Sequence, residues 1–231
     1  MADPLLLVPG LNCTAALFQP QSEVFSSERE VIIADNRSDD RVEAMAERAL
    51  ADAPERFALA GLSMGGYVAL AIQRMAPERV SRLALLDTTA RPDTPEGTER
   101  RRTLMAWARA GETARVHEAL WPRLVHPDRY GDRVLEEIVR TMMDDTGVEA
   151  FCRQQEAIIA RADSRPLLGA IACPTLVLVG AQDAITPVEM AQEMADAIPG
   201  AKLVVVPQTG HLATLEAPVH VNAALARWLM G

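Results

Sequence analysis

Apolar and β-branched residues gather along this chain in short runs, and most of the runs are bounded by glycine, proline or polar residues. Runs of this kind are typical of buried strands. They predict six strands, at Leu5 to Val8, Val31 to Ala34, Phe57 to Ala60, Val80 to Leu86, Thr175 to Val179 and Lys202 to Val206. Between the first four runs the apolar spacing is helical, around Phe18, from Val42 to Leu50 and from Gly65 to Met75. Strands that alternate with helices predict an α/β fold with a parallel sheet.

The pattern changes after residue 87, because residues 91–171 contain no convincing strand. Apolar residues recur there at helical spacing, at Leu104, Trp107 and Ala108, at Val134, Ile138 and Met142, and at Phe151, Ile158 and Ile159. This spacing predicts several amphipathic helices. We therefore expect a core domain of residues 1–90 and 172–231 and an all-helical insertion of residues 91–171, which is a candidate lid.

Composition is that of a globular enzyme with one core domain, since 49% of the 231 residues are hydrophobic and 24% are charged. No apolar run approaches the roughly 18 residues of a membrane span, and the first residues lack the basic segment of a signal peptide. We expect a cytoplasmic protein. Three cysteines without close spacing, Cys13, Cys152 and Cys173, favour packed thiols over a disulfide framework or a metal site.

The formal net charge of −9 disfavours binding to nucleic acid. The run Arg100-Arg101-Arg102 lies in a helical pattern beside Glu96 and Glu99, so we interpret it as a solvated face. The single lysine, Lys202, opens a predicted strand, which leaves no plausible carrier for Schiff-base chemistry.

Candidate chemistry begins at Gly61-Leu62-Ser63-Met64-Gly65, between a predicted strand and a predicted helix. A serine on such a sharp turn projects its hydroxyl from the edge of the sheet toward a base, and small neighbours permit the bend. Asp183 and His211 also follow predicted strands. Because the carboxyl ends of parallel strands share one edge, Ser63, Asp183 and His211 are expected to meet there.

The glycine-flanked serine and the chain order serine, aspartate, histidine resemble the α/β-hydrolase superfamily. Gly210-His211-Leu212 and Leu215-Glu216-Ala217-Pro218 resemble its small single-lid members, such as carboxylesterases and enol-lactone hydrolases. The resemblance implies a wholly or mostly parallel sheet of about six strands flanked by helices, with a helical lid before the penultimate strand. It implies no metal or organic cofactor.

By this resemblance Ser63 is the nucleophile, His211 the general base and Asp183 the acid that orients the imidazole. The backbone N–H groups of Leu11 and Met64 would form the oxyanion hole, although Pro9 stands where the superfamily usually carries a histidine.

Alternatives to these residues remain. Some members of the superfamily place the acid where Asp87 lies, and Asp183 could instead cap a helix that begins near residue 187. His117 and His126 lie in the insertion and His220 opens the last helix, so we interpret all three as surface or packing residues.

We therefore predict a serine hydrolase that cleaves a small carboxylic ester or lactone through an acyl-enzyme on Ser63. Its partners would be a small-molecule substrate and water, without nucleic acid or membrane. The sequence neither predicts nor excludes a homodimer. The same three residues would also serve thioester, C–C bond or perhydrolase chemistry. A small-molecule sensor on this scaffold, with incidental turnover, is the alternative from another class.

Overall fold

A six-stranded, wholly parallel sheet forms the centre of the molecule in the computed structural model, which describes residues 2–231. The strands are β1 (Leu5–Val8), β2 (Val31–Ile33), β3 (Phe57–Leu62), β4 (Val80–Leu86), β5 (Thr175–Gly180) and β6 (Lys202–Val206). Their order across the sheet is β2-β1-β3-β4-β5-β6. The six predicted strands and the parallel arrangement are confirmed.

Three strands end one or two residues away from the predicted positions. β2 ends at Ile33 rather than Ala34, and β5 includes Gly180. β3 continues past Ala60, because Gly61 and Leu62 pair with Leu85 and Leu86 of β4. The last residue of β3 therefore directly precedes Ser63.

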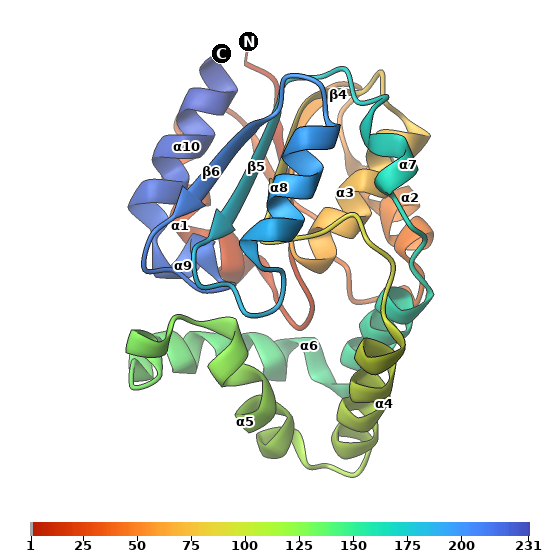
Figure 1. Cartoon of the computed structure of the whole chain (residues 1–231), viewed down its shortest axis with the longest axis vertical. Coiled ribbons are helices and arrows are strands. Elements are labelled where there is room, and N and C mark those ends of the chain that lie inside the picture. The colour runs from red at the N-terminus through yellow and green to blue at the C-terminus, as the bar shows by residue number, and fades with distance from the viewer. Residues whose placement is uncertain (1) are drawn as a thin grey trace.

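Helices cover both faces of the sheet (Figure 1). The long ones are α1 (Gln19–Phe25), α2 (Val42–Asp52), α3 (Met64–Met75), α8 (Val188–Ala197) and α10 (Pro218–Met230). Short helices are η1 (Ala15–Phe18) and α9 (Ala213–Glu216). Leu6 and Val8 of β1 pack into the core with α2, α3 and α8, whereas Leu5 and Leu7 pack with α1 and α10. Because both faces are buried, the strands consist of continuous apolar runs.

The insertion contains α4 (Pro95–Arg109), α5 (Thr113–Leu124), η2 (Pro127–Arg129), α6 (Arg133–Ala160) and α7 (Arg165–Leu168). Its helices α4, α5 and α6 lie beyond the carboxyl ends of the strands (Figure 1). The chain breaks helical geometry inside α6 at Gly147, where φ is 74°. Val134, which we placed in an apolar stripe, is 75% exposed, so the apolar face of α6 begins at Leu135 instead.

The insertion has a small apolar cluster of its own and also packs on the core. Its own cluster consists of Leu104, Met105, Ala108, Val116, Phe151 and Cys152. Ala157 and Ile158 at the end of α6 join the sheet core instead, which anchors the insertion beside the carboxyl edge of the sheet. Across residues 2–231, no helix has both the length and the apolar character that crossing a bilayer requires.

Candidate active site

Ser63 lies on a strained turn between β3 and α3, with φ of 56° and ψ of −117°. Such a conformation costs on the order of 1–3 kcal/mol for a residue other than glycine. Its peptide groups are held on both sides, since the Ser63 N–H donates to the Leu86 carbonyl at 3.0 Å and Thr88 Oγ1 donates to the Ser63 carbonyl at 2.7 Å. The strain is therefore offset by contacts with the neighbouring strand β4 and the residues after it.

The glycines around Ser63 are required by close packing. A Cβ on Gly65 would collide with the carbonyl oxygen of Val8, and a Cβ on Gly61 would collide with the backbone of Gly65. The absence of these carbon atoms lets the start of α3 rest against the end of β1. The loop that follows β1 is thereby brought beside the serine.

His211 connects Ser63 to Asp183. Its Nε2 lies 2.8 Å from Ser63 Oγ, and its Nδ1 lies 2.8 Å from Asp183 Oδ2. Because an ionised carboxylate can only accept, Nδ1 carries a proton in this arrangement and Nε2 of the neutral ring accepts the serine hydroxyl. The histidine and aspartate side chains are 3% and 0% exposed, so water competes little for these contacts.

Asp183 is the ionised member of this group. Burial, the largest effect, favours the neutral acid, but the interaction with His211 and several hydrogen bonds outweigh it and lower the pKa of Asp183. Its Oδ1 accepts the N–H groups of Ile185 and Thr186 at 2.8 and 2.9 Å, and its Oδ2 also accepts Thr186 Oγ1 at 2.8 Å. The N-cap of α8 is Pro187, so the interpretation of Asp183 as a helix cap is wrong.

Asp87, the alternative acid, has a different environment. It is fully buried, its Oδ1 accepts the Gly180 N–H at 2.8 Å, and its Oδ2 has no hydrogen-bond partner among residues 2–231. Burial and the nearby charge of Asp183 raise the pKa of Asp87 well above its ordinary range. The raised pKa favours the neutral form of Asp87, which joins the end of β4 to β5 through Gly180, and His211 Nδ1 contacts Asp183 instead.

The loop after β1 is held by a chain of buried amides that sequence reasoning missed. Asn12 has φ of 59° and its N–H donates to Gln154 Oε1 at 2.8 Å. Gln154, which is 0% exposed, donates to the carbonyl of Asn36 at 3.2 Å, and Asn36 Nδ2 donates to the carbonyl of Pro9 at 2.9 Å. The conformation of this loop therefore depends on α6 of the insertion.

The two predicted oxyanion donors lie on either side of Ser63. Leu11 belongs to the loop just described and lines the pocket beside Ser63, and Met64 begins α3 directly after the serine. Among residues 2–231, neither backbone N–H has a protein acceptor. The role of these two N–H groups as oxyanion donors stays a prediction.

Glu216 fixes the loop that carries His211. One carboxylate oxygen accepts the Gly210 N–H at 3.0 Å and the other accepts the His126 N–H at 2.7 Å. Burial raises the pKa of Glu216, and the surrounding N–H groups oppose that effect. In the sequence Glu216 was part of the Leu215-Glu216-Ala217-Pro218 motif that carries the family resemblance, but the motif gave no indication of this role.

The other histidines take structural positions. His117 is buried, contacts Glu136 Oε1 through Nε2 at 3.0 Å and stacks on Trp121 with ring centroids 5.8 Å apart. His126 caps η2, and His220 is exposed in the first turn of α10. Among the described residues, no group of three or more His, Cys, Asp or Glu side chains is arranged to hold a metal ion.

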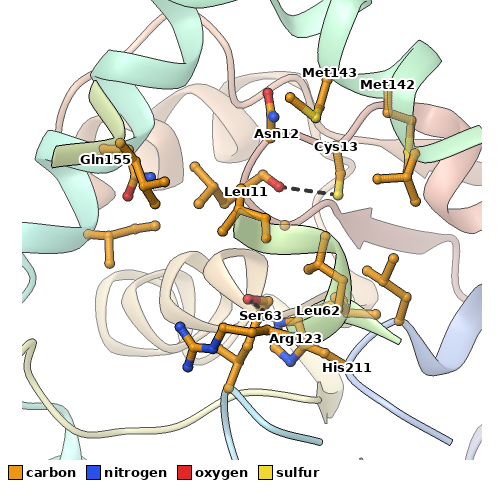
Figure 2. Close-up of a pocket in the computed structure, with 18 of the residues that line it drawn as sticks. Leu11, Asn12, Cys13, Leu62, Ser63, Arg123, Met142, Met143, Gln155 and His211 are labelled. Atoms are coloured by element: carbon orange, nitrogen blue, oxygen red, sulfur yellow. Dashed lines mark hydrogen bonds between the residues drawn. The ribbon is translucent and has the colours of Figure 1, made fainter. Parts of the chain in front are cut away.

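Ser63 and His211 open onto a pocket whose far wall is formed by the insertion (Figure 2). Its empty space, counted out to open solvent, is about 860 Å³. Apolar side chains supply most of the lining, among them Leu62, Leu104, Leu120, Val139, Met142 and Ile158.

Arg100 and Arg101 of α4 also line this pocket. The interpretation of Arg100-Arg101-Arg102 as a solvated face is therefore wrong for Arg101, which is largely buried, whereas Arg100 is exposed to solvent although it also lines the pocket. α4 turns one side toward the sheet edge, and only Arg102 lies away from the pocket and exposed.

Comparison with known proteins gives the family. A sequence model of the Alpha/beta hydrolase family matches residues 5–225. The chain belongs to this family. It is 31% identical over 183 residues to the dihydrolipoyllysine-residue acetyltransferase component of the acetoin cleaving system of Pseudomonas putida. That match covers 74% of this chain but only 45% of the relative, so this family member spans less than half of that protein.

Two solved structures of the family are similar over the whole chain. A thermophilic esterase from Thermogutta terrifontis is 34% identical with a TM-score of 0.90, covering 100% of this chain and 90% of the esterase. The enol-lactonase from Burkholderia xenovorans LB400 is 26% identical with a TM-score of 0.90, covering 100% and 92%. The resemblance to carboxylesterases and enol-lactone hydrolases is confirmed.

Proposed function

We propose that this α/β hydrolase is a serine hydrolase that cleaves a small carboxylic ester or lactone. The observation that carries the proposal is the contact of His211 with Ser63 Oγ on one side and Asp183 on the other, both at 2.8 Å, at the base of a pocket. A hydroxyl, a base and an orienting carboxylate at these distances are what nucleophilic acyl transfer needs.

In the proposed reaction Ser63 Oγ attacks the carbonyl carbon while its proton moves to His211 Nε2. The imidazolium that forms is stabilised by the ionised Asp183. The carbonyl oxygen becomes negative and accepts the N–H groups of Leu11 and Met64, each typically worth about 2.7–4 kcal/mol in the transition state.

Collapse of this intermediate breaks the bond to the leaving oxygen, which takes the proton from His211, and leaves an ester on Ser63. A water molecule then gives its proton to His211, attacks the ester carbonyl and releases the acid and the free serine hydroxyl. With a lactone the leaving oxygen stays attached to the acyl group, so the product is one hydroxy acid.

The choice of an ester or lactone is supported by the esterase and the enol-lactonase described above, two of the solved structures that match the chain over its whole length. The mainly apolar lining fits an acyl chain or ring rather than a highly polar substrate.

We also propose that residues 91–171 act as a lid over a core domain of residues 1–90 and 172–231. Side chains of α4, α5 and α6 form the pocket wall that faces Ser63, and Gln154 of α6 holds the loop that carries Leu11. In this proposal the insertion shapes the acyl pocket and also fixes an oxyanion donor.

Turnover of a panel of short p-nitrophenyl esters and simple five- and six-membered lactones tests this function. We expect hydrolysis of several members by the wild-type protein and a loss of at least about 10⁴-fold in Ser63→Ala. Arg102→Gln, on the exposed side of α4, is the control and should keep wild-type rates. Activity that survives Ser63→Ala would refute the nucleophile.

A further inference from the structure

Positive charge is concentrated at the pocket although the chain as a whole is acidic, with a net charge of −9. Arg100 and Arg101 of α4 and Arg123 of α5 all line the pocket that contains Ser63. Charged side chains are uncommon in apolar pockets unless they are paired or bind a ligand. Whether these arginines would bind an anionic ligand therefore depends on how many carboxylates of the protein already neutralise them.

Among residues 2–231, only one carboxylate forms an ion pair with any of these three arginines. Asp93 lies 3.3 Å from Arg101, but it also lies 3.2 Å from Arg161, so two guanidinium groups share it. The side chains of Arg101 and Asp93 are 15% and 6% exposed, so solvent screens this region weakly. Arg101 therefore keeps excess positive charge toward the pocket.

Arg100 and Arg123 form no ion pair with a carboxylate within residues 2–231. Arg123 donates only to the carbonyl of Ala184, at 3.1 Å. Burial, with the positive charges of Arg100 and Arg101, lowers the pKa of Arg123, which means that these guanidinium groups lie close enough to repel each other. A bound anion would remove this repulsion.

Gln155 of α6 supplies an independent indication of a ligand. It is 0% exposed and lines the same pocket, and its Oε1 accepts Arg101 Nη1 at 2.9 Å. Its Nε2 is buried and has no acceptor among the described residues. A buried donor without an acceptor is unfavourable because it has lost its hydrogen bonds to water, so a ligand acceptor at this position would be strongly favoured.

We propose that Arg101 and Gln155, with Arg100 and Arg123 adding positive charge nearby, form a carboxylate subsite, and that the substrates are esters or lactones carrying a second, free carboxylate. This inference rests on the proposed function for the reacting bond and adds the group that selects the substrate. Guanidinium groups recognise carboxylates through paired hydrogen bonds, and Gln155 Nε2 would supply a further donor.

The positions in the pocket fit a substrate with two separated groups. Figure 2 shows Ser63, His211 and Arg123 grouped together and Gln155 apart from them. The scissile carbonyl would lie at Ser63, the apolar lining would contact the carbon chain, and the free carboxylate would lie at Gln155 and Arg101, whose side chains are hydrogen-bonded at 2.9 Å. Arg123 lies nearer to Ser63. Acid length is therefore expected to matter.

Binding to the Ser63→Ala protein tests the subsite without turnover. The probes are methyl monoesters of linear dicarboxylic acids of four to eight carbons, each paired with a neutral compound in which a carboxamide replaces the free carboxylate. Isothermal titration calorimetry should show at least one acid binding about tenfold or more tightly than its amide. Equal affinities at every length, or no binding of any acid, would overturn the subsite.

Variants then test whether the preference for the acid over the amide comes from the proposed subsite. Arg100→Gln, Arg123→Gln and Gln155→Leu, each in the Ser63→Ala background, should bring the affinity for the acid close to that for the amide, while the affinity for the amide changes less than about twofold. Arg102→Gln is the matched control because it removes the same charge from the same helix outside the pocket. A preference that persists in all three pocket variants, or disappears equally in Arg102→Gln, would contradict the assignment.

Two failures can be told apart. If the wild-type protein hydrolyses neutral esters but the acids bind no better than the amides, the subsite fails and the proposed function stands. If the acids are preferred in binding but Ser63→Ala leaves turnover unchanged, the hydrolase mechanism fails and the subsite stands.

Discussion

Asp183→Asn should remove most of the activity while it leaves the fold intact. The oxygen of the new amide would face the N–H groups of Ile185 and Thr186, because turning the NH₂ group toward them would oppose donors at 2.8 and 2.9 Å. The NH₂ group would then lie against His211 Nδ1, which must accept instead of donate. The proton would move to Nε2, and His211 could no longer accept the proton of Ser63.

The size of the effect follows from this change of tautomer. A histidine held in the wrong tautomer lowers kcat by about 10⁴-fold in serine hydrolases of this design, which corresponds to about 5 kcal/mol of transition-state free energy. Stability should change little, since Thr186 Oγ1 can accept from the new amide and no cavity is made. We therefore expect a catalytic loss without unfolding.

The assay is steady-state hydrolysis of the best ester in the panel, with the melting temperature measured in parallel. Asp87→Asn is the matched control, because it makes the same chemical change in the neighbouring buried acid that does not contact His211. The reasoning is refuted if Asp183→Asn keeps kcat/KM within tenfold of wild type, or if Asp87→Asn is the more damaging change.

Three further outcomes are expected. Asp87→Asn should raise the melting temperature by an amount that grows between about pH 4 and pH 8, because a buried acid with a raised pKa loses stability as pH rises and an amide does not; a gain that is largest at low pH would contradict this. Gln154→Leu removes the acceptor of the Asn12 N–H and should lower kcat by roughly 10- to 100-fold with little change in KM, whereas Gln154→Glu, which keeps an acceptor, should retain more activity. Gly65→Ala should destabilise the protein by more than about 3 kcal/mol in urea unfolding, whereas Gly131→Ala, with nothing within 4 Å of a new Cβ, should not.

The strands could be predicted because both faces of the sheet are buried, so that apolar runs mark them directly. The ends of the strands could not be predicted, because they depend on which residues pair with the neighbouring strand. Gly61 looks like the end of a strand in the sequence because glycine favours turns, but Gly61 and Leu62 continue β3 by pairing with β4.

The insertion was predicted as helical, but the exposure of its residues was not. Val134 fits an apolar stripe by spacing and is nevertheless 75% exposed at the start of α6. Arg101 fits a solvated face by composition, and its side chain is nevertheless only 15% exposed and lines the pocket. Which side of an amphipathic helix is buried depends on the elements it packs against. Because a long arginine side chain can bury its apolar stem, an arginine in the sequence does not show which side is exposed.

At the site, chain order and strand ends pointed to Ser63 and His211, and the structure brings the two side chains together. Asp183 and Asp87 both follow strands, so position alone could not separate them; their contacts and burial do. Gln154 gave no indication of its contact with Asn12, because a glutamine within an amphipathic helix is usually solvated. Such contacts between distant segments become visible only in the folded chain.

The most direct test of the account is the site of covalent labelling by a fluorophosphonate. The account predicts one added phosphonyl group per chain, found by peptide mass spectrometry on Ser63, and no label in Ser63→Ala or on unfolded protein. A label on another residue, or none on a folded protein that hydrolyses esters, would contradict the claim that Ser63 is the nucleophile.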